Sequence, residues 1–269
     1  MQIGQSVNAA PENEPIWRKA MTRNRIPSIF LGAFVLVAAL IAPRPASAQT
    51  PQDPKDPYAT MAPIDQYLMD RDAEIALARS AAPDAISKDA SVIVMTRHGY
   101  ETAVQGTNGW ACWVGRSWGG MFDYPEFWNP KIRAAECINA PAVRSVLPYA
   151  YKRTELILAG KSKAEIITAM KAAIDRKELP ALEPGTVSYM MSKTSYLTDQ
   201  GGHNLPHMMF YSGADAAAWG ANLANSPVMG GSYWCISPDA YPLLKSFPPL
   251  SVFMIAAEKW SDGTPAGGM

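Results

Sequence analysis

We look for chemistry first at the three histidines of the 269-residue chain, which are His98, His203 and His207. His98 follows an apolar run and stands between Arg97 and Gly99. The other two histidines are four residues apart, in a segment that begins with Asp199. Imidazole and carboxylate groups are ligands for zinc, so a metal site is one candidate that this pattern raises.

The tripeptide Arg97-His98-Gly99 resembles the opening signature of the histidine phosphatases, in which a strand delivers this turn. The resemblance implies phosphoryl transfer to His98 in a parallel α/β fold, with a helix after the turn. Here the following residues alternate in hydropathy and reach Asn108-Gly109, a dipeptide typical of tight hairpin turns. We therefore favour a solvated turn between two strands, with Gly99 supplying a positive φ, and keep phosphoryl transfer as a third hypothesis.

The segment 199–207 indicates a conditional zinc site. On a helix, the spacing of its two histidines would place both rings over one ion, but two glycines and Pro206 argue against a helix. Four extended residues span about 13 Å, too far for a shared ion, so a turn at 204–206 would have to bring the rings together. The ligand set would then come from His203, His207, Asp199 and His98. The alternative is a glycine-rich loop in which His207 begins a strand.

Aromatic residues are dense between positions 110 and 128. Trp and Tyr rings stack on sugars, aromatic ligands and cations, which favours a small-molecule site. The alternative is that these rings cover the sheet as a lid, because large aromatic side chains mostly pack. The candidate ligand-binding residues are His207, His203, Trp110, Trp113 and Trp118.

The N-terminal region is typical of a cleavable secretory signal. Residues 26–42 are almost wholly apolar, basic side chains precede them, and Ala46-Ser47-Ala48 follows. The uninterrupted core of 14 residues, Ile29 to Ala42, is shorter than the roughly 20 that a spanning helix needs. We expect a signal peptide at 1–48, with Met21 as the true start, and no stable membrane insertion after cleavage. The exported protein, periplasmic or extracellular, would hold a Pro-rich linker at 49–62 and a single domain at 63–269.

Charge and cysteine content indicate which classes of partner and which cellular compartment suit the protein. The chain has 24 basic and 24 acidic side chains, and no basic cluster that would indicate nucleic-acid binding. All three cysteines, Cys112, Cys137 and Cys235, lie in the exported part. In an oxidising compartment we expect one disulfide, and we favour Cys112–Cys137 because it closes the shortest loop. Three buried free thiols are the alternative.

The hydropathy pattern predicts an α+β domain with a mostly antiparallel sheet and a helical hairpin packed on it. Alternation and apolar runs predict strands at 92–97, 100–105, 110–116, 185–193, 207–212, 227–237 and 250–258. The first three form a meander of neighbouring strands through the turn at Asn108-Gly109. Helices are expected at 63–81, from 142 or 147 to 159, and at 163–178, where Ser162 and Glu165 form a capping box, with a short helical turn at 214–219.

Three segments resemble exported bacterial proteins of uncharacterised role. They are Gly106-Thr107-Asn108-Gly109-Trp110 with Cys112, Tyr189-Met190-Met191-Ser192, and Pro206-His207-Met208-Met209-Phe210-Tyr211. The resemblance spans most of residues 91–260 and implies no activity, but it favours His207 over His98 as a site residue. We expect a binding or structural module with a small-molecule ligand. The alternative function is a His-dependent, metal-assisted hydrolase.

Overall fold

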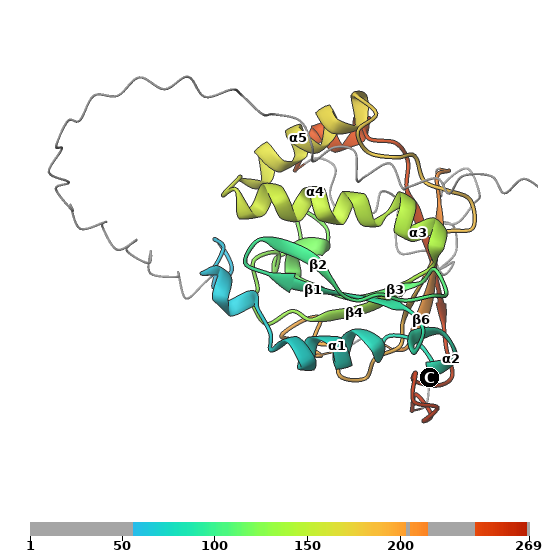
Figure 1. Ribbon diagram of the computed structural model, residues 1–269. Coiled ribbons are helices and arrows are strands. Elements are labelled where there is room, and N and C mark those ends of the chain that lie inside the picture. The colour runs from blue at the N-terminus through green and yellow to red at the C-terminus, as the bar shows by residue number, and fades with distance from the viewer. Residues whose placement is uncertain (1–55, 203–204, 215–239, 268–269) are drawn as a thin grey trace, which may run out of the picture. The chain divides into compact units, whose positions relative to one another are not determined.

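The computed structural model describes residues 56–202, 205–214 and 240–267 (Figure 1). These residues belong to one compact unit, Thr50–Met269. Within them, seven strands form one sheet in the order β2-β1-β3-β4-β5-β6-β7. The strands are β1 Ser91–Thr96, β2 Gly99–Val104, β3 Ala111–Gly115, β4 Ala134–Ile138, β5 Val187–Met190, β6 His207–Ser212 and β7 Ser251–Ala256.

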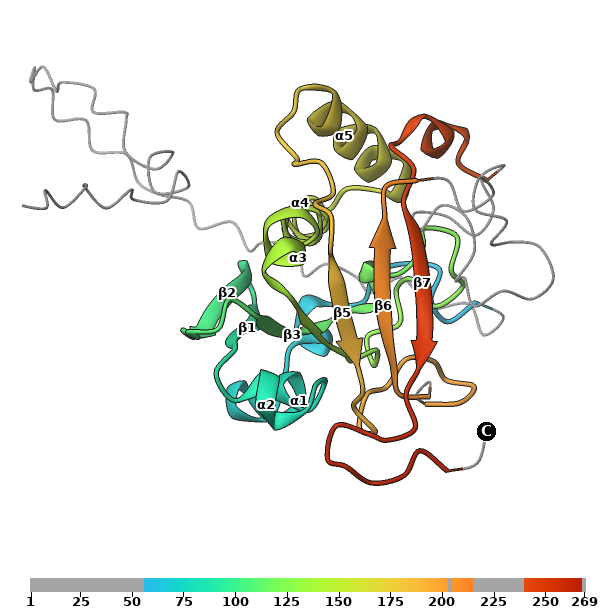
Figure 2. The same ribbon diagram turned by 90° about the vertical axis from the view of Figure 1, so that its right-hand side faces the viewer.

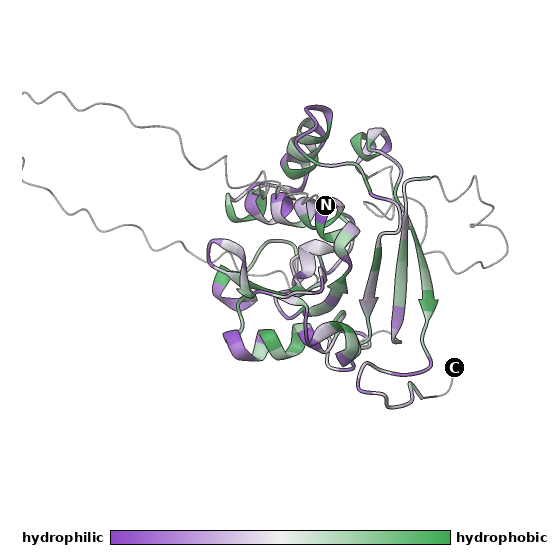
Figure 3. Ribbon diagram, turned by 45° about the vertical axis from the view of Figure 1, so that its right-hand side comes forward, coloured by the Kyte–Doolittle hydropathy of each residue, from purple (hydrophilic) through white to green (hydrophobic). Residues whose placement is uncertain are grey.

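The helices lie on both faces of this sheet. Figure 1 shows α1 and α2 on one side of β1 and β3, and α3 and α4 on the other, with α5 beyond α4. In Figure 3 hydrophobic and hydrophilic residues alternate along α1, as expected of a helix with one buried side. The α-helices are α1 Arg71–Arg79, α2 Asp84–Ser87, α3 Ala140–Ser145, α4 Leu147–Leu158 and α5 Lys163–Asp175. The short 3-10 helices are η2 Ile64–Tyr67, η3 Ser117–Gly119 and η5 Pro242–Ser246.

This arrangement confirms the α+β class and the mostly antiparallel sheet. Every neighbouring pair of strands is antiparallel except β1 and β3. The hairpin of helices is also present, because α4 ends before Gly160, which has φ +73°, and Ser162 and Glu165 form the expected capping box of α5.

Successive side chains of β3 and β4 point to opposite faces of the sheet, so they pack in two separate layers. Cys112 and Cys137 point to the α1 side, where they pack against small residues of that helix such as Ala78. They are joined in a disulfide, which confirms the predicted pairing. Trp113 and Glu136 are directly opposite each other in the register and point to the other side, toward α3 and α4.

The placement of the third strand differs from the prediction. Residues 106–110 do turn, with Gly109 at φ +77°, but β3 does not return beside β2. The Thr107 amide donates to Asp89 O at 2.8 Å, and the Asn108 side chain donates to Ile86 O at 2.7 Å. These bonds draw the chain back across the start of β1, so that β3 pairs with β1 in parallel.

The predicted helix at 63–81 is interrupted. The η2 turn ends at Tyr67, Leu68 is extended, and Asp70 begins a new helix by accepting hydrogen bonds from the amides of Asp72 and Ala73. The predicted elements at 214–219 and 227–237 lie, except for residue 214, outside the described residues, as do the signal segment and Cys235. Within the described residues, no helix combines the length and hydropathy that a bilayer span requires.

Candidate functional site

A cavity of about 670 Å³ lies between the sheet and helices α3 and α4. Its floor is a row of side chains that crosses five strands, from Trp113 on β3 to Met254 on β7. The register produces this row, because Met190 lies opposite His207 and Met209 lies opposite Met254 on neighbouring strands. Figure 2 shows β5, β6 and β7 side by side, as this floor requires. The volume is within the usual range for small-molecule sites.

The wall opposite the floor comes largely from α4 and the residue before it. Val146, Tyr149, Ala150 and Arg153 border the cavity, and their spacing of three and four residues places them on one side of a helix. The Tyr149 hydroxyl donates to Pro180 O at 2.8 Å, which fixes the ring over the cavity. Further apolar walls come from Met121, Ile132, Leu182, Leu197, Pro248, Pro249 and Leu250.

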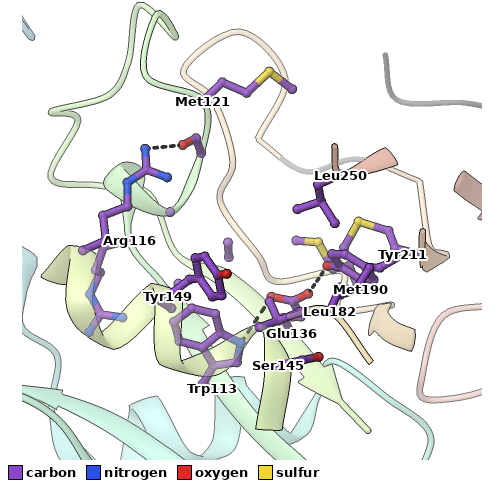
Figure 4. Close-up of a pocket in the computed structure, with 18 of the residues that line it drawn as sticks. Trp113, Arg116, Met121, Glu136, Ser145, Tyr149, Leu182, Met190, Tyr211 and Leu250 are labelled. Atoms are coloured by element: carbon purple, nitrogen blue, oxygen red, sulfur yellow. Dashed lines mark hydrogen bonds between the residues drawn. The ribbon is translucent and has the colours of Figure 1, made fainter. Parts of the chain in front are cut away.

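Glu136 is the polar centre of the floor, as Figure 4 shows. Trp113 Nε1 donates to its Oε2 at 3.2 Å, and the Tyr211 hydroxyl donates to its Oε1 at 3.0 Å. Burial raises the pKa of Glu136, and hydrogen bonds from Ser188, Tyr211 and Trp113 oppose that shift. The side chain is enclosed by protein yet keeps part of its surface accessible, because it borders the cavity.

His207 lies on the same floor and is 2% exposed. Its Nδ1 is 2.7 Å from Leu205 O, and since a carbonyl only accepts, Nδ1 carries the proton of the neutral ring. Burial lowers the pKa of His207, which also favours the neutral form. The structure therefore brings two of the predicted ligand-binding residues, Trp113 and His207, to one cavity.

The other two predicted tryptophans lie elsewhere. Trp118 is 2% exposed in the core, packs against Tyr67, and donates from Nε1 to Thr154 Oγ1 at 3.0 Å. Trp110 packs against Tyr189 on the α1 side of the sheet. Neither ring is among the described residues that line the cavity, so the aromatic stretch is mainly core.

His98 does not join the predicted ligand set. It occupies an exposed turn between β1 and β2, where Gly99 has φ +113°, as the turn interpretation expected. Four strands separate β2 from β6, which carries His207. The five spacings from β2 to β6, at about 4.8 Å each, place the two imidazoles roughly 24 Å apart, too far to share an ion. The strand after His98 also differs from the helix that the phosphatase resemblance implies.

Asp199 is engaged in a different set of contacts. Its carboxylate accepts hydrogen bonds from the hydroxyls of Tyr58 and Tyr196 and lies 3.3 Å from Lys131 Nζ. The bonds from Tyr196 and Tyr58 lower the pKa of Asp199 to about 2. His203 lies outside the described residues, and within those residues no group of three or more His, Cys, Asp or Glu side chains is placed to hold a metal.

The sequence prediction missed Glu136, Tyr149 and Tyr211, which are among the polar residues that line the cavity. Glu136 carried a readable signal, because it is the single charged residue of the apolar strand 134–138. A carboxylate in such a strand must face a polar partner or a cavity. No family model, curated protein or solved structure matches the chain.

Proposed function

We propose that the protein binds an apolar small molecule in the cavity above β3–β7. The observation that supports this most is the cavity itself, with about 670 Å³ enclosed mainly by aliphatic, aromatic and thioether side chains. Transfer of an apolar ligand from water into a cavity of that composition is favourable by about 25 cal/mol per Å² of apolar surface buried.

The character of the lining supports a binding role. Four methionines border the cavity: Met121, Met190, Met209 and Met254. Their unbranched side chains adapt to ligands of different outline. The few polar groups, Glu136 foremost, are held by hydrogen bonds within the protein, and such fixed groups orient a ligand.

The test is calorimetric titration with naphthalen-2-ylmethanol, a neutral probe with one hydroxyl group. We expect one site per chain. Ala134→Phe should weaken binding at least tenfold, because Ala134 borders the cavity two residues before Glu136 on the same face of β4. The melting temperature of this variant shows whether it folds.

The control is Ile255→Ser, which changes the outer face of β7, where Ile255 is 50% exposed. We expect wild-type affinity from this variant. If Ile255→Ser abolishes binding and Ala134→Phe retains it, the probe binds the outer sheet surface and the proposal is wrong.

A further inference from the structure

We infer that the ligand of this cavity is an organic cation, an amine or quaternary ammonium group on an apolar body, whose charge pairs with Glu136. This inference rests on the proposed function, since it names the chemical class that the same cavity takes. It is carried by the position of Glu136 and by the charges that surround it.

Every hydrogen bond to Glu136 within the described residues comes from an uncharged donor. Trp113 and Tyr211 each donate to one carboxylate oxygen, and Ser188, which lies 3.2 Å from the Tyr211 hydroxyl, also donates to the carboxylate. None of the ion pairs among the described residues includes Glu136. The two carboxylate oxygens together accept about four hydrogen bonds, so these three donors leave capacity for one more. Glu136 borders the cavity, so a ligand there can supply that bond.

The other charged groups that border the cavity are engaged in its walls. Arg116 is fully buried and pairs with Glu74 at 2.9 Å. The Arg153 guanidinium lies 3.9 Å from the centre of the Phe122 ring and donates to Gly120 O at 2.7 Å. Burial lowers the pKa of His207 and so favours its neutral form, and the bond to Leu205 O opposes this shift. Glu136 is therefore the ionisable group without a charged partner that a ligand reaches at the floor.

The walls near Glu136 suit a cation as well as an apolar body. Trp113, Tyr211 and Tyr149 present aromatic rings, and the negative face of an aromatic ring attracts organic cations. A buried carboxylate without a cation is costly and resists ionisation. A bound ammonium group offsets that cost, so Glu136 should release its proton as the cation binds.

The experiment compares three probes of one shape and different charge: naphthalen-2-ylmethylamine, which is a cation at pH 7, naphthalen-2-ylmethanol and 2-naphthoate. We expect the amine to bind wild-type protein at least tenfold more tightly than the alcohol. In Glu136→Gln that preference should disappear, so that the amine and the alcohol bind the variant with similar affinity. Binding of the alcohol also shows that the variant keeps its cavity.

A second measurement needs no variant. Calorimetric titrations in buffers of different ionisation enthalpy report how many protons are released when a probe binds. We expect wild-type protein to release protons when it binds the amine and none when it binds the alcohol. Equal affinity for amine and alcohol, or an amine preference that survives Glu136→Gln, overturns the inference and leaves the cavity proposal standing. If the naphthoate binds most tightly of the three probes, the ligand is an anion that pairs with Arg153, and the inference is wrong. If no probe binds, the proposed function itself fails.

Discussion

Removal of the Cys112–Cys137 disulfide should destabilise the protein by an amount that follows from its loop. The two cysteines are 25 residues apart, and the chain-entropy relation for a loop of that length gives about 3.5 kcal/mol at 25 °C. Both residues are fully buried, so Cys→Ala substitution also removes packed sulfur atoms. Reduction of the wild-type protein separates the two effects, because it breaks the bond and keeps the sulfurs.

The assay is urea unfolding of oxidised and reduced protein in a Cys235→Ala background, which prevents exchange with the third thiol. We expect the free energy of unfolding to fall by about 3.5 kcal/mol on reduction, with a larger m-value because the unfolded chain expands. The probe alcohol should bind almost unchanged at low urea, because five residue pairs hold β3 against β4 and the cysteines face away from the cavity. A loss below about 1 kcal/mol, or a loss of probe binding on reduction, would refute this reasoning.

Three further outcomes are expected. Glu74→Ala should cost about 3–5 kcal/mol in urea unfolding because it leaves the fully buried Arg116 without its ion-pair partner. Arg144→Ala, at an exposed ion pair, should cost far less, and similar losses in the two variants would contradict the assignment. Burial raises the pKa of Glu136, so the folded state holds this proton more tightly than the unfolded state and wild type loses stability as pH rises above the unfolded pKa of about 4.3. Glu136→Gln has no such proton and should therefore become more stable relative to wild type. Thermal melts at pH 4 and pH 7 test this, and a difference in melting temperature between variant and wild type that does not widen contradicts it. The pKa of Asp199 is lowered to about 2, so the stability that its ionised carboxylate contributes is present above pH 4 and lost as pH falls toward 2. Because this carboxylate accepts a hydrogen bond from Tyr58, Asp199→Asn should speed proteolysis near Tyr58 at pH 7. An unchanged cleavage rate contradicts this.

Local patterns in the sequence predicted much of the fold. The capping box at Ser162 specifies the start of α5 through bonds within four residues, and the apolar run at 207–212 matches the bounds of β6. Such patterns can be recognised in a sequence because the residues that form them are close together in the chain. The disulfide was predictable for a related reason, since a short loop favours closure.

The pairing of β3 with β1 was not predictable from the Asn108-Gly109 turn. The turn is present, but the side chain of Asn108 is bonded to Ile86, more than twenty residues earlier in the chain. That contact decides the direction in which β3 leaves, and no local pattern reports it. The interrupted helix at 68–70 is similar, because Arg133 donates to Leu68 O across the fold.

The cavity was partly predictable. Trp113 and His207 were candidates from residue type alone, and their register positions bring them to one floor. Trp118 had the same residue type but the opposite outcome, because its indole meets Thr154 in the core. Glu136 was missed because the strand 134–138 was not among the predicted strands, so its single charged residue was not placed in the sheet.

The most direct measurement is a crystal structure of the protein with 6-bromonaphthalen-2-ylmethylamine, located by the anomalous signal of the bromine. We expect one bromine site in the cavity, with the ring between Trp113 and Tyr149 and the ammonium nitrogen within about 3 Å of a Glu136 oxygen. A single bromine site on the outer face of β6 and β7, near Ile255, would contradict the account.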